Sequence, residues 1–325
     1  MTLEGYGNLP SLSWFINDVN AICFRFGVDL FLMLSGALSL GRNWDIKSFL
    51  GKRLPRIISP FLFWGFVLSV ISVLISYFYP DILKTIDPYS AYNFLIYLRN
   101  NYLSNSPNFA PYWFFWMILG TYLIMPILNK WLLNSDLKEA EYFLVIWAVT
   151  CTFQYTLFIN QPINLTYFTG AIGAVVLGYY LRHTKREIFN KVSYSIIFIV
   201  ISTLLMLLIS HMFSTADKYY VFNRFSILVV IEVIGIFILL KNLNWEVDSS
   251  SIFYKAIFSI AKYSYGIYLN HQFFMFIVMV LLNEFINIGP CYYLLILFIC
   301  TLVGSWGLLA ILNRIPYVNR VIGAK

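Results

Sequence analysis

Nine long apolar runs divide this chain, and they limit its folds more than any other feature. Each run is close to the roughly 20 residues that an α-helix needs to cross the hydrocarbon core of a bilayer. Backbone polar groups inside a bilayer must pair within their own segment, so the runs predict an all-α, polytopic membrane helix bundle of about nine spans. The runs lie near residues 20–40, 57–79, 112–133, 141–159, 163–181, 192–213, 222–240, 257–282 and 290–312.

The composition excludes a water-soluble fold. Hydrophobic residues make up 60% of the 325 residues and charged residues only 11%, whereas soluble domains carry about 25% charged residues. No stretch is long enough to act as a linker between two domains. We therefore expect one integral membrane domain over residues 1–325, with the lipid bilayer as its solvent.

The lysines and arginines predict the orientation. If the loop 41–56 is cytoplasmic, it and the alternate loops after it hold 16 of the 22 basic residues, which is the bias found in cytoplasmic loops. The net charge of +7 is then explained by topology, and no nucleic-acid partner is expected. This orientation places the C-terminus in the cytoplasm and the N-terminus outside.

The start of the chain is unusual for that topology. Residues 1–19 contain neither an apolar core nor a basic leader, so they do not form a signal peptide. We expect a span that precedes these residues to be missing from this sequence. The four cysteines have no CxxC or CxxH spacing, so neither a disulfide framework nor a metal site is predicted.

Ionisable side chains inside spans are the first candidates for function, because they are costly in a bilayer. Arg25 and Asp29 lie four residues apart and share one helix face. They form either a self-compensating structural pair or the polar wall of a cavity. Glu232 lies in the middle of the run 222–240 and needs a partner that the sequence does not name.

Two further groups of residues point to a substrate. Arg53 and Arg56 lie three apart beside Lys52, and they are either ordinary cytoplasmic charge or a site for phosphates, which arginine binds through two oxygens at once. Tyr268 and His271 share one face of the run 257–282 with Ser264, which places hydroxyls and an imidazole in the bundle. The histidine is either a satisfied hydrogen-bonding residue or, with the tyrosine on the same face, part of a substrate-lined cavity.

The ordered motifs resemble the acyltransferase 3 family of integral membrane acyltransferases. The resemblance rests on FGVDLFLMLSG (26–36), FLGKRLPRIISP (49–60), YWFFWMILGTYLIMPIL (112–128) and SYGIYLNH (264–271). It is nearest to the bacterial O-acetyltransferases of surface polysaccharides and their lipid-linked precursors. The resemblance implies ten spans, multi-pass insertion in the bacterial plasma membrane, and transfer of an acetyl or other short acyl group from acyl-CoA to a glycan or lipid-linked sugar.

The resemblance also implies roles for single residues. Arg53 and Arg56 match the motif that serves the acyl-CoA donor, which is a substrate and not a tightly bound cofactor. Arg25 matches the arginine before the Val-Asp-Leu-Phe run. The late histidine of the family falls on His271, and the tryptophan of its aromatic span on Trp113.

One departure from the family affects activity. Relatives begin with a span that carries a basic residue and, about eleven positions later, the histidine taken as the catalytic base, and this sequence has no such span. The chain is then either a shortened sequence of an active enzyme or a naturally shortened, inactive relative.

The expected mechanism joins these residues in one cavity. Arg53 and Arg56 hold the donor phosphates, and Arg25, Asp29, Tyr268 and His271 line the reaction site. Trp113 and Glu232 are further substrate-binding candidates. A base deprotonates a sugar hydroxyl, either for direct attack or through an acyl-enzyme intermediate. His271 is the available substitute for the missing histidine, and Arg25 stabilises the oxyanion. A transporter or flippase for a lipid-linked saccharide or small solute is the alternative, although no inverted repeat is evident.

Overall fold

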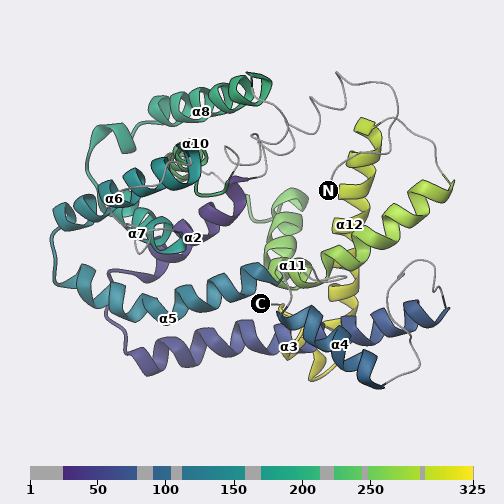
Figure 1. Ribbon diagram of the computed structural model, residues 1–325. Helices are drawn as coiled ribbons and strands as arrows, with labels where there is room; N and C mark the ends of the chain where they lie inside the picture. Colours follow the sequence, from purple (N-terminus) through teal and green to yellow (C-terminus); the bar gives the residue numbers. More distant parts are fainter. Residues whose placement is uncertain are drawn as a thin grey trace. The chain divides into compact units, whose positions relative to one another are not determined.

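The computed structural model describes residues 25–78, 91–103, 112–157, 170–212, 223–243, 248–285 and 290–324 (Figure 1). Every regular element within these ranges is a helix. The chain forms two compact units: residues 1–44 with 123–245, and residues 45–122 with 246–325. Residues 1–19, on which the expectation of a missing span rests, lie outside the described residues.

The first unit consists mainly of short helices. Helix α5 (Trp113–Leu133) contributes its second half to this unit, from residue 123 onward. The other elements are α2 (Phe26–Ser39), α6 (Leu137–Cys151) with the π-helical turn η1 (Thr152–Leu157), α7 (Ala171–His183), the 3₁₀ turn η3 (Glu187–Phe189), α8 (Val192–Met212) and α10 (Ile227–Asn242).

The second unit contains the longest helices. It includes the first half of α5. Its other elements are α3 (Ile46–Phe78), α4 (Ala91–Leu103), α11 (Ile252–Phe285), α12 (Pro290–Leu312) and the 3₁₀ turn η4 (Val318–Arg320).

Helix lengths confirm an all-α membrane protein with several spans. Five of the described helices are long and apolar enough to cross a bilayer, within α3, α5, α8, α11 and α12. The other runs contain the shorter helices α2, α6, α7 and α10, of 14, 15, 13 and 16 residues. Each of the nine predicted runs therefore contains a helix.

Helix α3 begins earlier than the predicted boundary. The loop expected over 41–56 ends at Asp45, because its carboxylate accepts a hydrogen bond from the Ser48 backbone N–H at 3.1 Å and caps the helix. The helix then runs from Ile46 to Phe78 through Pro55 and Pro60. Arg53 and Arg56 are consequently helical residues and not loop residues.

Helix α2 is continuous through the small residues Ser35 and Gly36. Gly36 allows α2 to cross α7 closely: a Cβ at this position would lie 1.9 Å from the carbonyl oxygen of Val175. From the other helix, a Cβ at Gly178 would lie 1.9 Å from the carbonyl oxygen of Met33. The pair is a small-residue helix crossing of the kind common in membranes.

Asn129 of α5 fixes the chain where α2 ends. Its Oδ1 accepts a hydrogen bond from the Gly41 backbone N–H at 2.8 Å, and its Nδ2 donates to the Arg42 carbonyl at 3.0 Å. Gly41 adopts a φ of +72°, which glycine tolerates best. This side chain therefore joins α5 to the turn that follows α2.

We expect Asn129→Ala to lower the free energy of unfolding by about 1–3 kcal/mol, because two backbone groups lose their partner in a site where Asn129 is only 4% exposed. Thermal unfolding of the purified protein in detergent measures the change. Asn134→Ala is the matched control: this exposed side chain, just after α5, donates to the Lys130 carbonyl in the last turn of that helix, so a change within about 0.5 kcal/mol is expected. Equal losses for the two variants would contradict the role of Asn129.

Candidate functional site

A basic stretch of α3 carries the predicted phosphate-binding arginines in the second unit. Arg53 is half-buried, and its Cζ lies 5.8 Å from the ring centroid of Phe49 and 5.8 Å from that of Tyr122. These two rings meet edge to face at 6.2 Å. Arg56, one turn further along the helix, is exposed. The aromatic contacts orient one guanidinium while its neighbour stays accessible.

A tyrosine and histidine face lies on α11 of the same unit. The Tyr268 ring lies 6.1 Å from the Tyr265 ring, 6.2 Å from the His271 ring and 5.1 Å from the Phe114 ring, measured between centroids. Ser264, which the helical spacing placed on this face, is exposed. The residue that lies beside Tyr268 on this face is instead Tyr265, which was not singled out from the sequence.

The His271 imidazole makes a hydrogen bond with the preceding turn of its helix. Its Nδ1 lies 2.7 Å from the carbonyl oxygen of Tyr268. A carbonyl oxygen only accepts, so this contact is a hydrogen bond when Nδ1 carries the proton. In the neutral imidazole the lone pair is then on Nε2. The arrangement suits a side chain that accepts a proton through Nε2.

The aromatic span predicted around Trp113 contributes two neighbouring residues to this region. Trp113 itself is 39% exposed and meets Phe114 edge to face at 5.9 Å. Phe114 is the residue that contacts Tyr268. Tyr112 is 2% exposed, and its hydroxyl has no hydrogen-bond partner among the described residues. Tyr112 interacts electrostatically with Tyr265 and Tyr268, and the sequence spacing gave no signal for it.

Asn270 is a second buried polar residue that the sequence did not single out. It is fully buried beside His271 on α11, and within the described ranges neither its side-chain oxygen nor its nitrogen has a hydrogen-bond partner. Burying an amide without a partner is unfavourable. This residue and Tyr112 place unused hydrogen-bonding capacity in the same unit as His271.

Arg25 and Asp29 lie in the first unit and do not form a salt bridge with one another. The salt bridges between described residues are Arg186 with Glu141 and Lys191 with Glu187. Asp29 is 2% exposed, and its carboxylate interacts electrostatically with Arg224, just before α10. Neither carboxylate oxygen of Asp29 has a hydrogen-bond partner among the described residues, so Arg224 offsets the burial of this group only at a distance.

Glu232 also lies in the first unit, between α10 and α8. It is 4% exposed, and its Oε1 accepts a hydrogen bond from the Thr203 hydroxyl at 3.4 Å. This distance is long for a hydroxyl donor. The partner that the sequence did not name is thus a threonine of the neighbouring helix, and a substrate-binding role for Glu232 stays a prediction.

The predicted residues fall into two groups. Arg53, Arg56, Trp113, Tyr268 and His271 belong to the second unit. The first unit holds Arg25, Asp29 and Glu232. The cavity predicted to join the two groups therefore stays a sequence-based prediction.

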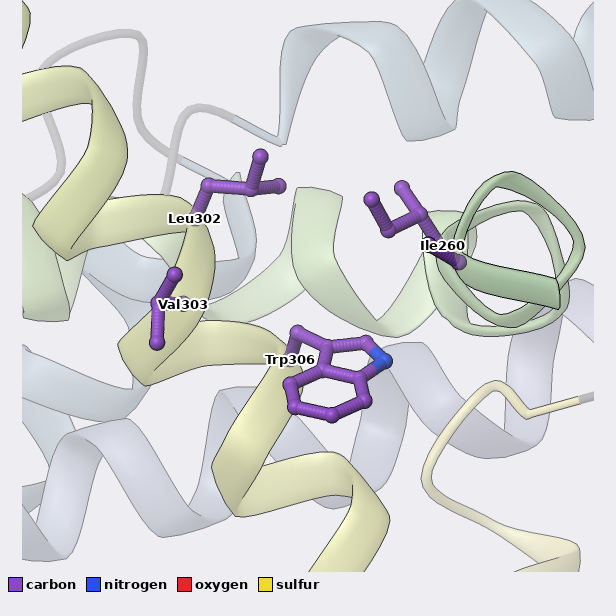
Figure 2. Close-up of a pocket in the computed structure, with 5 residues that line it drawn as sticks. Ile260, Leu302, Val303 and Trp306 are labelled. Carbon is purple, nitrogen blue, oxygen red and sulfur yellow. The ribbon is translucent and has the colours of Figure 1, made fainter. Parts of the chain in front are cut away.

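A separate apolar pocket lies between α11 and α12 (Figure 2). The indole N–H of Trp306 donates to the Ser259 hydroxyl at 2.9 Å, so the one polar atom of that ring already has a partner. No lining side chain is ionisable, and proton transfer cannot take place on these walls. The pocket is lined by Ala256, Ile260, Leu302, Val303 and Trp306.

Comparison with known proteins identifies the family. The model of the acyltransferase 3 family, described as an acyltransferase domain, matches residues 2–310. Neither the curated proteins nor the solved structures include a significant match. The family match covers nearly the whole chain and includes both the basic stretch of α3 and the tyrosine and histidine face of α11. This chain therefore belongs to the acyltransferase 3 family of membrane acyltransferases.

Proposed function

We propose that this protein moves an acetyl or other short acyl group from acyl-CoA to a hydroxyl of a cell-surface glycan or lipid-linked sugar in the bacterial plasma membrane. One observation carries the proposal: a guanidinium oriented by aromatic rings, an exposed arginine one turn away and an imidazole with Nε2 as its acceptor belong to one unit. The donor is a substrate that binds and leaves in each cycle.

The chemistry of α3 supports a phosphate-bearing donor. Arg53 and Arg56 are three residues apart, so they lie on neighbouring parts of one helix face. The exposed Lys47 and Lys52 add positive charge to the same helix. A guanidinium stays charged at every physiological pH and binds two phosphate oxygens at once. The nucleotide of CoA supplies such phosphates, and the predicted topology places this stretch of α3 at the cytoplasmic surface.

The imidazole of His271 supports transfer to a hydroxyl. In the proposed step, the acceptor oxygen attacks the thioester carbonyl carbon while its proton passes to Nε2 of His271. The carbon–sulfur bond then breaks, and the CoA thiolate takes the proton back from the imidazolium. The roles of Arg25, Asp29, Trp113 and Glu232 in this reaction stay sequence-based predictions.

We expect Arg53→Ala and Arg56→Ala each to weaken CoA binding roughly tenfold to a hundredfold, because each removes charge-assisted hydrogen bonds to phosphate. Equilibrium binding to the purified protein in nanodiscs measures the effect. Lys47→Ala is the matched control, since it removes one exposed positive charge from the same helix. Its expected effect is small and disappears at high salt.

A second donor analogue separates phosphate binding from other effects. Acetyl-pantetheine carries the thioester without the nucleotide phosphates. Both arginine variants are expected to bind it as the wild-type protein does. If the two variants bind CoA with unchanged affinity, or lose acetyl-pantetheine to the same extent as CoA, the donor-site assignment is wrong.

A further inference from the structure

The segment 317–323 folds back onto the second unit after α12. It starts with a residue of left-handed conformation, Tyr317 at a φ of +67°, passes through η4, and ends at Gly323 with a φ of +83°. Ile322, just before that glycine, is fully buried. The segment is therefore exposed at its start, where Tyr317 is 78% exposed, and anchored in the protein at its end by Ile322 and Gly323.

Two contacts seat this segment between α3 and α11. The indole N–H of Trp64, on α3, donates to the Ile322 carbonyl at 3.1 Å. On α11, a Cβ at Gly266 would lie 2.5 Å from the same carbonyl oxygen. From the opposite side, a Cβ at Gly323 would lie 2.9 Å from the Gly266 backbone nitrogen. The backbone of Ile322 and Gly323 can come this close to the backbone of Gly266 only because positions 266 and 323 are both glycine. A Cβ atom at either position would be too close to backbone atoms.

The contact point adjoins the candidate site. A Cβ at Gly323 would also lie 3.2 Å from the Tyr265 ring. The Tyr265 hydroxyl donates to the Ile57 carbonyl of α3 at 2.8 Å, one residue after Arg56. The same ring stacks on Tyr268, whose carbonyl holds Nδ1 of His271. The segment thus supports the turn of α11 from which the tyrosine and histidine face begins.

We propose that segment 317–323 is a positioning element for acyl transfer, in which the backbone of Ile322 and Gly323 holds Gly266 and Tyr265 in place and thereby orients His271. The proposal rests on the proposed function for its activity readout. Ile322 and Gly323 touch neither donor nor acceptor in this scheme. Their effect reaches the reaction through α11.

Three glycine variants test the proposal. Gly323→Ala and Gly266→Ala place a methyl group in the same contact from its two sides. Gly307→Ala is the matched control, because a Cβ there meets no atom within 4 Å and the residue lies on α12 of the same unit. Trp64→Phe removes the hydrogen bond to Ile322 without adding strain, and an intermediate effect is expected from it.

The kinetic readout separates positioning from a general loss of folding. For Gly323→Ala and Gly266→Ala we expect kcat of acyl transfer to fall at least tenfold, the donor dissociation constant to stay unchanged, and the monodisperse protein to be recovered in normal yield. Gly307→Ala is expected to match the wild type in all three. A parallel loss of donor affinity in the two clash variants would show a structural effect and overturn the proposal.

A chemical readout keeps the proposal testable without acyl transfer. The chain has three histidines, so in a His183→Gln and His211→Gln background diethyl pyrocarbonate reports on His271 alone. Gly323→Ala and Gly266→Ala are expected to raise the rate of His271 modification severalfold, and Gly307→Ala to leave it unchanged. If Gly323→Ala and Gly266→Ala both leave the rate of His271 modification unchanged, the proposal is overturned. If the two variants raise this rate but the wild-type protein shows no acyl transfer, only the proposed function is contradicted.

Discussion

Replacing His271 by glutamine is expected to reduce the rate of acyl transfer about 10²- to 10⁴-fold, which is the usual contribution of a general acid–base side chain. Glutamine keeps a polar side chain of similar reach, but it does not accept a proton at neutral pH. Donor binding is expected to stay at the wild-type level, because the proposed phosphate contacts come from α3. The measurement is transfer of a radiolabelled acetyl group to a glycan acceptor, with the donor dissociation constant determined in parallel.

His183 provides the matched control for this substitution. It also bonds through Nδ1 to a backbone carbonyl of its own helix, that of Tyr179 at 2.9 Å, but it is exposed at the end of α7. His183→Gln is therefore expected to retain full activity. If His271→Gln transfers acetyl groups as fast as the wild type, the base is another group and the Nε2 assignment fails.

Helix positions followed from the sequence better than helix ends. The apolar runs located nine of the ten α-helices in the described part of the chain, all except α4, because a bilayer demands about 20 apolar residues per span. The start of α3 was placed too late, since basic residues and two prolines resemble a loop. Asp45 was the missed signal, because aspartate is a preferred N-cap residue. Its carboxylate accepts a hydrogen bond from the backbone N–H three residues later, which is that of Ser48.

The candidate site was only partly predictable. Arg53 and His271 were recognisable because their side chains are unusual in or beside an apolar run. Tyr268 was recognisable because it shares a helix face with His271. Tyr112 and Asn270 were not, because one tyrosine among 24 and one buried amide differ from others only in the partners that the fold supplies. The i, i+4 spacing predicted Arg25 beside Asp29, whereas the electrostatic partner of Asp29 is Arg224, which no local pattern identifies.

The second large effect is expected at the crossing of α2 and α7. Gly178→Ala should lower the free energy of unfolding by about 3 kcal/mol, the upper end of the usual cost of overpacking. The new Cβ would meet backbone atoms of Met33, at 1.9 Å from the oxygen, and a helix backbone cannot rotate away as a side chain does. Gly36→Ala should cost as much, because its Cβ would meet the Val175 carbonyl at the same distance. Unfolding in a detergent titration measures both.

Gly27→Ala separates this clash from the general preference of helices for alanine. Gly27 lies on α2, and a Cβ there meets no atom within 4 Å, so the substitution should be neutral or stabilise by about 0.5–1 kcal/mol. The double variant Gly36→Ala and Gly178→Ala should cost less than the sum of the two single variants, since one separation of the helices relieves both clashes. Strict additivity would mean that the two glycines act independently. A cost below the sum would mean that α2 and α7 move apart once for both substitutions. This movement would displace α2 and with it Arg25 and Asp29, which connects the crossing to the residues predicted to act on substrate.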